Sequence, residues 1–322
     1  MGDDQGAGQQ RARPRYLLHL AMFLATCLTT TWAGASQVHP ELSWLAPRQA
    51  LSLLPAGLPF ASALMAILLS HEMGHYLAAR VHGVAASLPL FLPLPVGLVG
   101  TLGAVIAMPR TVRDRNVLVD IGAAGPLAGL AVALPLLAYG IHLSPVAPSP
   151  PGGLVEGNSL LYLLLKLAIK GQLLPGGGVD VQLHAVAWAG WVGLLVTMIN
   201  LLPIGQLDGG HLATAWLGER QQRLAPWLHR ALLLVGAGAV AFTAWELAAR
   251  WPLGTALQAA IPAGMPWLVW WLLLTVLRRL DGGRYHPPVA SAPLSRGRGR
   301  LCWAMLLVLV LIASPIPLRV AP

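Results

Sequence analysis

The stretch ALMAILLSHEMGHYLAARVHG, residues 63–83, places His71, Glu72 and His75 in an HExxH pattern inside a long apolar run. Residues four apart share one face of an α-helix, so His71 and His75 can present two ring nitrogens to one metal ion. Glu72 lies beside them, where it can accept a proton from a water molecule. Inside a membrane an uncompensated Glu costs several kcal/mol, so the pattern favours a metal site over a structural polar cluster.

The composition around this stretch is that of a membrane protein. The chain has 322 residues, of which 56% are hydrophobic and 10% are charged, whereas about 25% are charged in a soluble domain. Apolar runs near the length of a membrane span recur at 16–35, 61–80, 117–141, 184–202, 224–249, 265–280 and 301–315. We therefore expect an all-α polytopic membrane protein with six or seven transmembrane helices. The shorter run 159–169 carries Lys166 and favours an interfacial helix.

The basic residues indicate how the chain is oriented. The net charge is +9, and the Lys and Arg residues stand in short segments between the apolar runs. If the N-terminus is cytoplasmic and seven spans alternate, sixteen of the 21 Lys and Arg residues fall on the cytoplasmic side. This bias favours membrane orientation as the cause of the charge, and we expect no nucleic-acid partner. The first run ends in Ala33-Gly34-Ala35, as a signal peptide can, but we favour an uncleaved span.

Three regions do not resemble simple spans. Residues 88–108, LPLFLPLPVGLVGTLGAVIAM, contain helix-breaking prolines and strand-forming residues, and predict a short membrane-embedded β-hairpin or re-entrant segment. Such a segment must be buried in protein or line a cavity. Residues 142–180 are expected to be mostly irregular, and residues 281–300, rich in Gly, Pro and Arg, are expected to be disordered.

These features divide the chain into four predicted parts. They are a cytoplasmic tail (1–15), a first span with a far-side loop (16–57), a catalytic transmembrane core (58–217) and C-terminal spans with a basic loop (218–322).

Asp208 is the candidate for a third metal ligand. A catalytic zinc usually has three protein ligands and one open position. In NLLPIGQLDGGH, residues 200–211, Pro203 and Gly205 interrupt the helix just before Asp208, which can let its side chain reach inward. The alternative is an ordinary cytoplasmic turn, because Asp-Gly-Gly is a common turn sequence. The span count, which ignores the motif, places His71 and Asp208 at the same cytoplasmic depth.

The two motifs resemble the site-2 protease family of intramembrane zinc proteases. HEMGH at 71–75 precedes the Asn-x-x-Pro…Asp-Gly segment at 200–211, and the resemblance covers about residues 64–211, including Gly122-Ala-Ala-Gly125-Pro126. It implies one zinc ion per chain on His71, His75 and Asp208, and Glu72 as general base. It also implies Asn200 as a hydrogen-bond donor to the scissile carbonyl; the alternative for Asn200 is a helix-to-helix hydrogen bond. We do not expect His211 to be a ligand.

The resemblance also implies a function. We expect an endopeptidase that hydrolyses a peptide bond within or near the transmembrane segment of a membrane-protein substrate, with water entering through a polar opening near Asp208. The edge of the 88–108 segment could pair with an unwound substrate strand. Expected partners are the substrate, the lipid bilayer, and a regulatory membrane partner or a second copy of the chain. The expected location is a bacterial inner membrane, with the site toward the cytoplasm. A metal transporter and a catalytically inactive scaffold that binds membrane proteins are the alternatives.

Overall fold

The computed structural model describes residues 16–43, 45–108, 112, 114–148, 152–287, 289 and 292–321. The predicted tail, 1–15, lies outside these residues. The helices are α1 (Tyr16–Val38), α2 (Pro47–Leu53), the 3-10 turn η1 (Leu54–Gly57), α3 (Leu58–Val81), α4 (Arg115–Leu143), α5 (Leu160–Lys170), α6 (Ala185–Asn200), α7 (Asp208–Leu217), α8 (Glu219–Ala248), α9 (Leu253–Leu280) and α10 (Arg296–Ile312). The strands are β1 (Leu90–Pro93), β2 (Thr101–Val105), β3 (Val146–Pro148), β4 (Leu154–Glu156), β5 (Val179–Val181) and β6 (Leu318–Val320).

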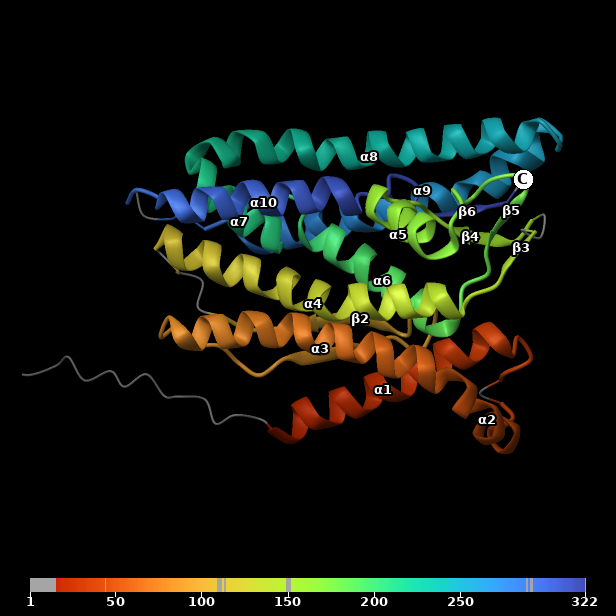
Figure 1. The fold of residues 1–322 in the computed structure, drawn as a ribbon. Helices are drawn as coiled ribbons and strands as arrows, with labels where there is room; N and C mark the ends of the chain where they lie inside the picture. The colour runs from red at the N-terminus through yellow and green to blue at the C-terminus, as the bar shows by residue number, and fades with distance from the viewer. Residues whose placement is uncertain are drawn as a thin grey trace, which may run out of the picture.

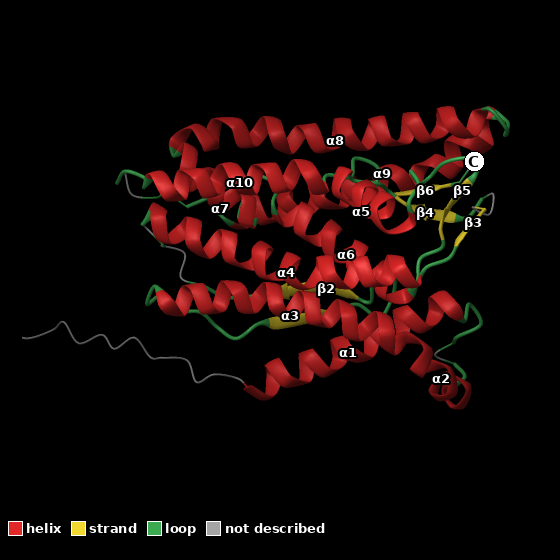
Figure 2. Cartoon of the chain, in the orientation of Figure 1, coloured by secondary structure: helices red, strands yellow, loops and turns green. Residues whose placement is uncertain are grey.

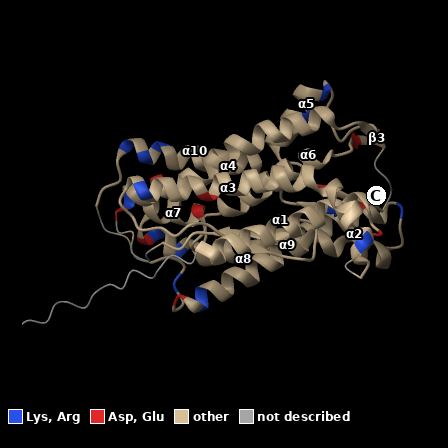
Figure 3. Cartoon of the chain, turned by 90° about the horizontal axis from the view of Figure 1, so that it is seen from below, with Lys and Arg blue, Asp and Glu red and all other residues tan. Residues whose placement is uncertain are grey.

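The described chain is a bundle of long apolar helices with short strand pairs (Figure 2). Each apolar run predicted as a span is helical over most of its length. Among the described residues, five helices are long and apolar enough to cross a membrane, against the six or seven spans expected: α1, the continuous α2–α3 stretch, α4, α8 and α9. α6 is equally apolar but has 16 residues. Lys and Arg gather at the two ends of the bundle, and its middle is nearly free of them (Figure 3). The prediction of an all-α polytopic membrane protein is confirmed.

The centre of the bundle is formed by α3, α4 and α6, which pack on one another (Figure 1). α7 packs against α4, α1 lies against α3 on one flank, and α8, α9 and α10 form the other flank. α4 begins where the Asp114 side chain accepts a hydrogen bond from the Asn116 amide, as an N-cap does. Gly140 lets α4 approach α6 closely, because a Cβ there would lie 2.2 Å from the Ala187 nitrogen.

The β-hairpin predicted in residues 88–108 is present. β1 and β2 pair antiparallel, with Leu90 opposite Val105 and Phe91 opposite Ala104. Phe91 is buried, and its ring meets that of Phe23 on α1 edge to face, with 5.1 Å between the centroids. The hairpin is therefore covered by α1 on one side, as a polar backbone in a membrane requires.

Residues 142–180 are more ordered than their Pro and Gly content suggests. The predicted helix is present as α5, but the structure adds β3 paired with β5, and β4 paired with β6 near the C-terminus. Lys166 is fully buried, with its Nζ 2.9 Å from Asp180 Oδ1. The expectation of a mostly irregular segment is corrected, because the partners of these three-residue strands and of Lys166 are remote in sequence.

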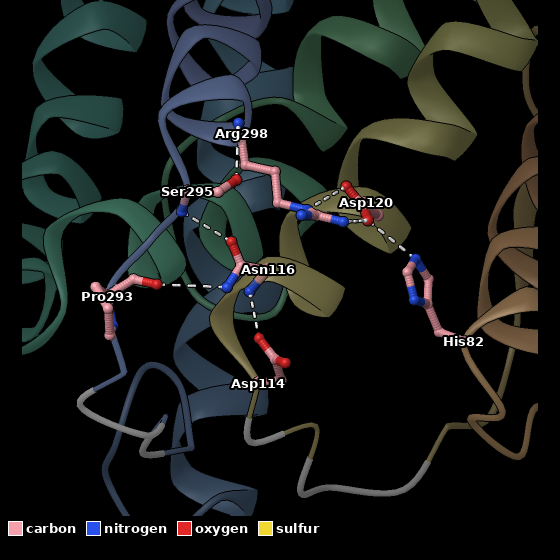
Figure 4. Close-up of polar contacts among 7 residues, drawn as sticks. All are labelled: His82, Asp114, Asn116, Asp120, Pro293, Ser295 and Arg298. Carbon is pink, nitrogen blue, oxygen red and sulfur yellow. Dashed lines mark hydrogen bonds and ion pairs between the residues drawn. The ribbon is translucent and has the colours of Figure 1, made fainter.

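The expectation of disorder in residues 281–300 is wrong for the described residues among them. Tyr285 and His286 are buried, and α10 begins at Arg296. Figure 4 shows contacts that hold the start of α10 against α4. The Arg298 guanidinium binds Asp120 on α4, and His82 Nε2 lies 2.9 Å from the same carboxylate. The Ser295 backbone N–H donates a hydrogen bond to Asn116 Oδ1 at 2.9 Å (Figure 4). One carboxylate thus joins α4, α10 and the end of α3.

Candidate metal centre

Three predicted ligands converge between α3 and α7. His71 Nε2 lies 3.2 Å from Asp208 Oδ2, and His75 Nε2 lies 3.2 Å from Asp208 Oδ1. The two Nε2 atoms are themselves 3.2 Å apart. Both histidines are buried, and the Asp208 side chain is 14% exposed. Among the described residues, these three form the group of His, Cys, Asp and Glu side chains that could hold a metal ion.

The helix interruption before Asp208 is what brings it to the histidines. α6 ends at Asn200, and α7 begins at Asp208. Gly205 in the turn has φ of +64°, a left-handed conformation that favours glycine. Gly209 allows α7 to fold back on the end of α6, because a Cβ there would lie 2.0 Å from the Leu201 carbonyl oxygen. Gly205 thus breaks the helix as expected. The Asp-Gly-Gly sequence does not form an ordinary turn but begins α7.

A row of glycines on α4 forms the floor of the site. A Cβ on Gly125 would lie 2.0 Å from His75 Nε2, and one on Gly129 would lie 3.2 Å from His71 Cβ. The third glycine, Gly122, faces His211 Cβ at 3.3 Å. These glycines allow α3 and α7 to pack closely on α4. The structure adds that each one lies beneath a particular histidine.

The geometry fits a tetrahedral zinc ion. Zinc bonds of 2.0–2.1 Å at tetrahedral angles separate neighbouring ligand atoms by about 3.3 Å; the three separations here are 3.2 Å. His75 Nδ1 lies 2.8 Å from the Ile121 carbonyl oxygen, to which it donates, so its Nε2 carries the lone pair that a metal needs. Asp208 Oδ2 is buried and, apart from the ion-pair contact with His71, makes no hydrogen bond among the described residues, so a cation would satisfy it.

Glu72 and Asn200 are placed beside this ligand set. Glu72 follows His71 on α3 and is 8% exposed. Asn200 Nδ2 lies 3.4 Å from His71 Nε2, at the last residue of α6. The structure therefore brings all five predicted site residues together. The base role of Glu72 and the donor role of Asn200 stay predictions.

Two contacts of the site have no clear signal in the sequence. The Ile121 carbonyl that orients His75 is a backbone atom, so no residue type marks it. His211 Nδ1 lies 2.7 Å from Nε2 of His286, and His286 follows α9, far from His211 in the sequence. The predicted polar opening is not the cavity of about 200 Å³ beside α7, because its lining, including Leu212, Trp216 and Met305, is almost wholly apolar.

Comparisons with known proteins match the same region of the chain. A model of the family described as Peptidase family M50 matches residues 59–242. The probable chloroplastic zinc metalloprotease EGY1 of Arabidopsis thaliana is 35% identical over 224 residues, which cover 64% of this chain and 40% of that protein. The probable chloroplastic zinc metalloprotease EGY2 of Oryza sativa subsp. indica is 36% identical over 176 residues, covering 53% of this chain and 31% of that protein. No solved structure matches.

The chain spans less than half the length of these curated relatives. Their names place them in chloroplasts, so they give no support to the predicted bacterial inner membrane. They and the apolar helices agree with a membrane protein that carries a zinc metalloprotease site.

Proposed function

Because the chain belongs to peptidase family M50, the site-2 protease family, we propose that it is a zinc-dependent endopeptidase of membrane-protein substrates. It cleaves a peptide bond within or near a transmembrane segment, as in regulated intramembrane proteolysis. The observation that carries the proposal is the position of the ligand set: His71, His75 and Asp208 meet inside a bundle of apolar helices. A protease site enclosed in this way acts on substrates that share the membrane.

Each side chain has a defined part in the reaction. Zinc, when bound by His71, His75 and Asp208, supplies a water molecule of lowered pKa and polarises the scissile carbonyl. The Glu72 carboxylate accepts a proton from the attacking water and passes it to the leaving amine. The Asn200 amide donates a hydrogen bond to the oxygen that becomes negative in the transition state, a contribution of about 3–4 kcal/mol in comparable sites. Gly125 keeps room beneath the ligands.

The β1–β2 hairpin supports a binding mode for the substrate. The peptide bonds of a transmembrane helix are shielded by their own hydrogen bonds, so the substrate must unwind before attack. β2 contacts α3, the helix of the HExxH motif, and pairs with β1 alone among the described strands. Its second edge carries backbone groups that could pair with an unwound strand, as peptides add to exposed sheet edges in other proteins. We place the substrate on this edge.

The charge distribution supports a sidedness for the site. Asp208 follows the fourth predicted span at the end that the charge count assigns to the cytoplasm, and this end carries most of the Arg residues. We propose that the site draws water from the side of the membrane that carries the basic loops, whichever membrane holds the protein. We also propose that a regulatory membrane partner or a second copy of the chain associates with the protein.

The test is a comparison of the wild-type protein with Glu72→Gln in the native membrane and in liposomes. Mass spectrometry of membrane fractions should show substrate stubs that accumulate in the variant, with cleavage sites inside or beside a transmembrane segment. Co-reconstituted substrate should be cut by the wild type only. Cleavage confined to soluble loops would contradict intramembrane proteolysis. Zinc flux across the liposomes without peptide cleavage would favour the metal transporter.

A further inference from the structure

His286 makes a directed contact with α7, the helix that begins with Asp208. His286 Nδ1 lies 2.7 Å from the Pro287 carbonyl oxygen, to which it can only donate. Burial lowers the pKa of His286 below its usual range, so the ring is neutral and its Nε2 carries a lone pair. His211 Nδ1, 2.7 Å away, is therefore the donor of the hydrogen bond between the two rings.

His286 also contacts α8, a helix outside the metal site. The Gln222 side-chain amide donates to the His286 carbonyl oxygen at 2.7 Å. The neighbouring Tyr285 hydroxyl lies 3.0 Å from His229 Nδ1 on α8. Both His286 and His229 are 4% exposed. The lone pair that accepts the His211 hydrogen bond is thus held, through the Gln222 contact, by a helix outside the metal site.

α7 needs an outside anchor near its start. It has ten residues, follows the Gly205 turn, and has no side-chain cap at Leu207. At the far end of the helix, Arg115 donates to the Ala215 and Trp216 carbonyls, and the Trp216 ring meets that of Trp303. Asp208 lies at the opposite end, and His211, one turn later, shares its face.

We propose that His286 is a positioning residue for the metal site: by accepting the His211 hydrogen bond it fixes the start of α7, and so holds Asp208 between His71 and His75. Small movements of Asp208 matter, because metal–ligand distances in a zinc site lie within about 0.2 Å of their usual values. His286 lies outside the residues that match the family, 59–242. His286 thus gives the segment after α9 a part in the site that the two motifs do not indicate.

The test measures zinc retention, since the inference rests on the proposed zinc site. His286→Leu removes the acceptor, whereas His286→Gln places an amide oxygen near the position of Nε2. The full-length protein is purified in detergent, and zinc release to a chelator is followed by metal analysis. Loss of a group that orients a ligand lowers metal affinity roughly 10–100-fold. We expect His286→Leu to release zinc faster by about this factor, and His286→Gln to release it as the wild type does.

His229→Leu is the matched control, because it removes an equally buried histidine and its hydrogen bond to Tyr285 but leaves the contacts of His286 with Gln222 and His211 in place. It should retain zinc. If His286→Leu does not fold, His286→Asn serves instead, since its shorter amide does not reach His211. The inference would be overturned if the variant without the acceptor released zinc at the wild-type rate. It would also be overturned if His229→Leu released zinc as fast as His286→Leu, or if His286→Gln did not restore the wild-type rate. A wild-type protein without zinc would overturn the proposed function as well.

Discussion

Gly125→Ala should remove the metal from the site. A Cβ at this position would lie 2.0 Å from His75 Nε2 and 2.4 Å from Cδ2 and Cε1 of the same ring. Ordinary van der Waals contact begins at 3.4 Å, so the ring or α4 must move by the difference, 1.4 Å. His75 cannot turn freely, because its Nδ1 donates to the Ile121 carbonyl oxygen of the same helix at 2.8 Å.

A displacement of that size exceeds the tolerance of a zinc site, which is about 0.2 Å. Even a 1 Å misplacement of a catalytic group can lower a rate about 100-fold. We therefore expect Gly125→Ala to bind much less than one zinc per chain and to cleave substrate at least about 100-fold more slowly than the wild type. The assays are metal analysis of the purified protein and cleavage of a co-reconstituted membrane substrate.

Two other glycines give the controls. Gly238, inside α8, has open space around it, because a Cβ added there would meet no described atom within 4 Å; Gly238→Ala should therefore keep both zinc and activity. Gly129→Ala should fall between them, because its Cβ would lie 3.2 Å from His71 Cβ, which requires a shift of a few tenths of an ångström. A Gly125→Ala protein with full zinc and wild-type cleavage would refute the inferred floor of the site.

Three further outcomes are expected. Asn200→Ala should keep zinc and lower kcat about 100–1,000-fold with little change in KM; wild-type kcat would remove its role as a donor. Burial raises the pKa of Glu156 to about 7. Its native carboxyl therefore binds a proton more tightly than the unfolded one, and its contribution of about 3 kcal/mol is present below pH 4.5 and lost as pH rises through about 7. The difference in unfolding free energy between wild type and Glu156→Gln, from thermal denaturation in detergent, should follow that pH course; a flat difference would contradict the buried carboxyl. Gly205→Ala, at φ of +64°, should destabilise the protein by about 1 kcal/mol; unchanged stability would argue against the left-handed turn.

The grouping of the three candidate metal ligands could be predicted from sequence because their signals are local. The i, i+4 spacing puts His71 and His75 on one helix face, and an apolar bilayer makes a buried Glu72 hard to explain otherwise. The helix break before Asp208 follows from Pro203 and Gly205, which act on their own turn. The hairpin followed from prolines and glycines in the same way.

The missed features depend on partners remote in sequence. Three-residue strands such as β4 are too short to show a period, and the partner of β4, β6, lies more than 150 residues further along the chain. Lys166 becomes buried because Asp180, on a different element, neutralises it. His286 lies in a Gly- and Pro-rich segment whose composition is that of a disordered region, and its contacts with His211 and Gln222 come from the packing of α7 and α8.

In the proposed reaction, His71, His75 and Asp208 hold a zinc ion that works with Glu72 to cleave a peptide bond in the membrane. The most direct measurement takes zinc content and substrate cleavage from the same Glu72→Gln preparation. Because Glu72 is not among the three ligands, the variant should bind one zinc per chain, as the wild type does, and should not cleave the substrate. Cleavage at the wild-type rate by Glu72→Gln would contradict the account.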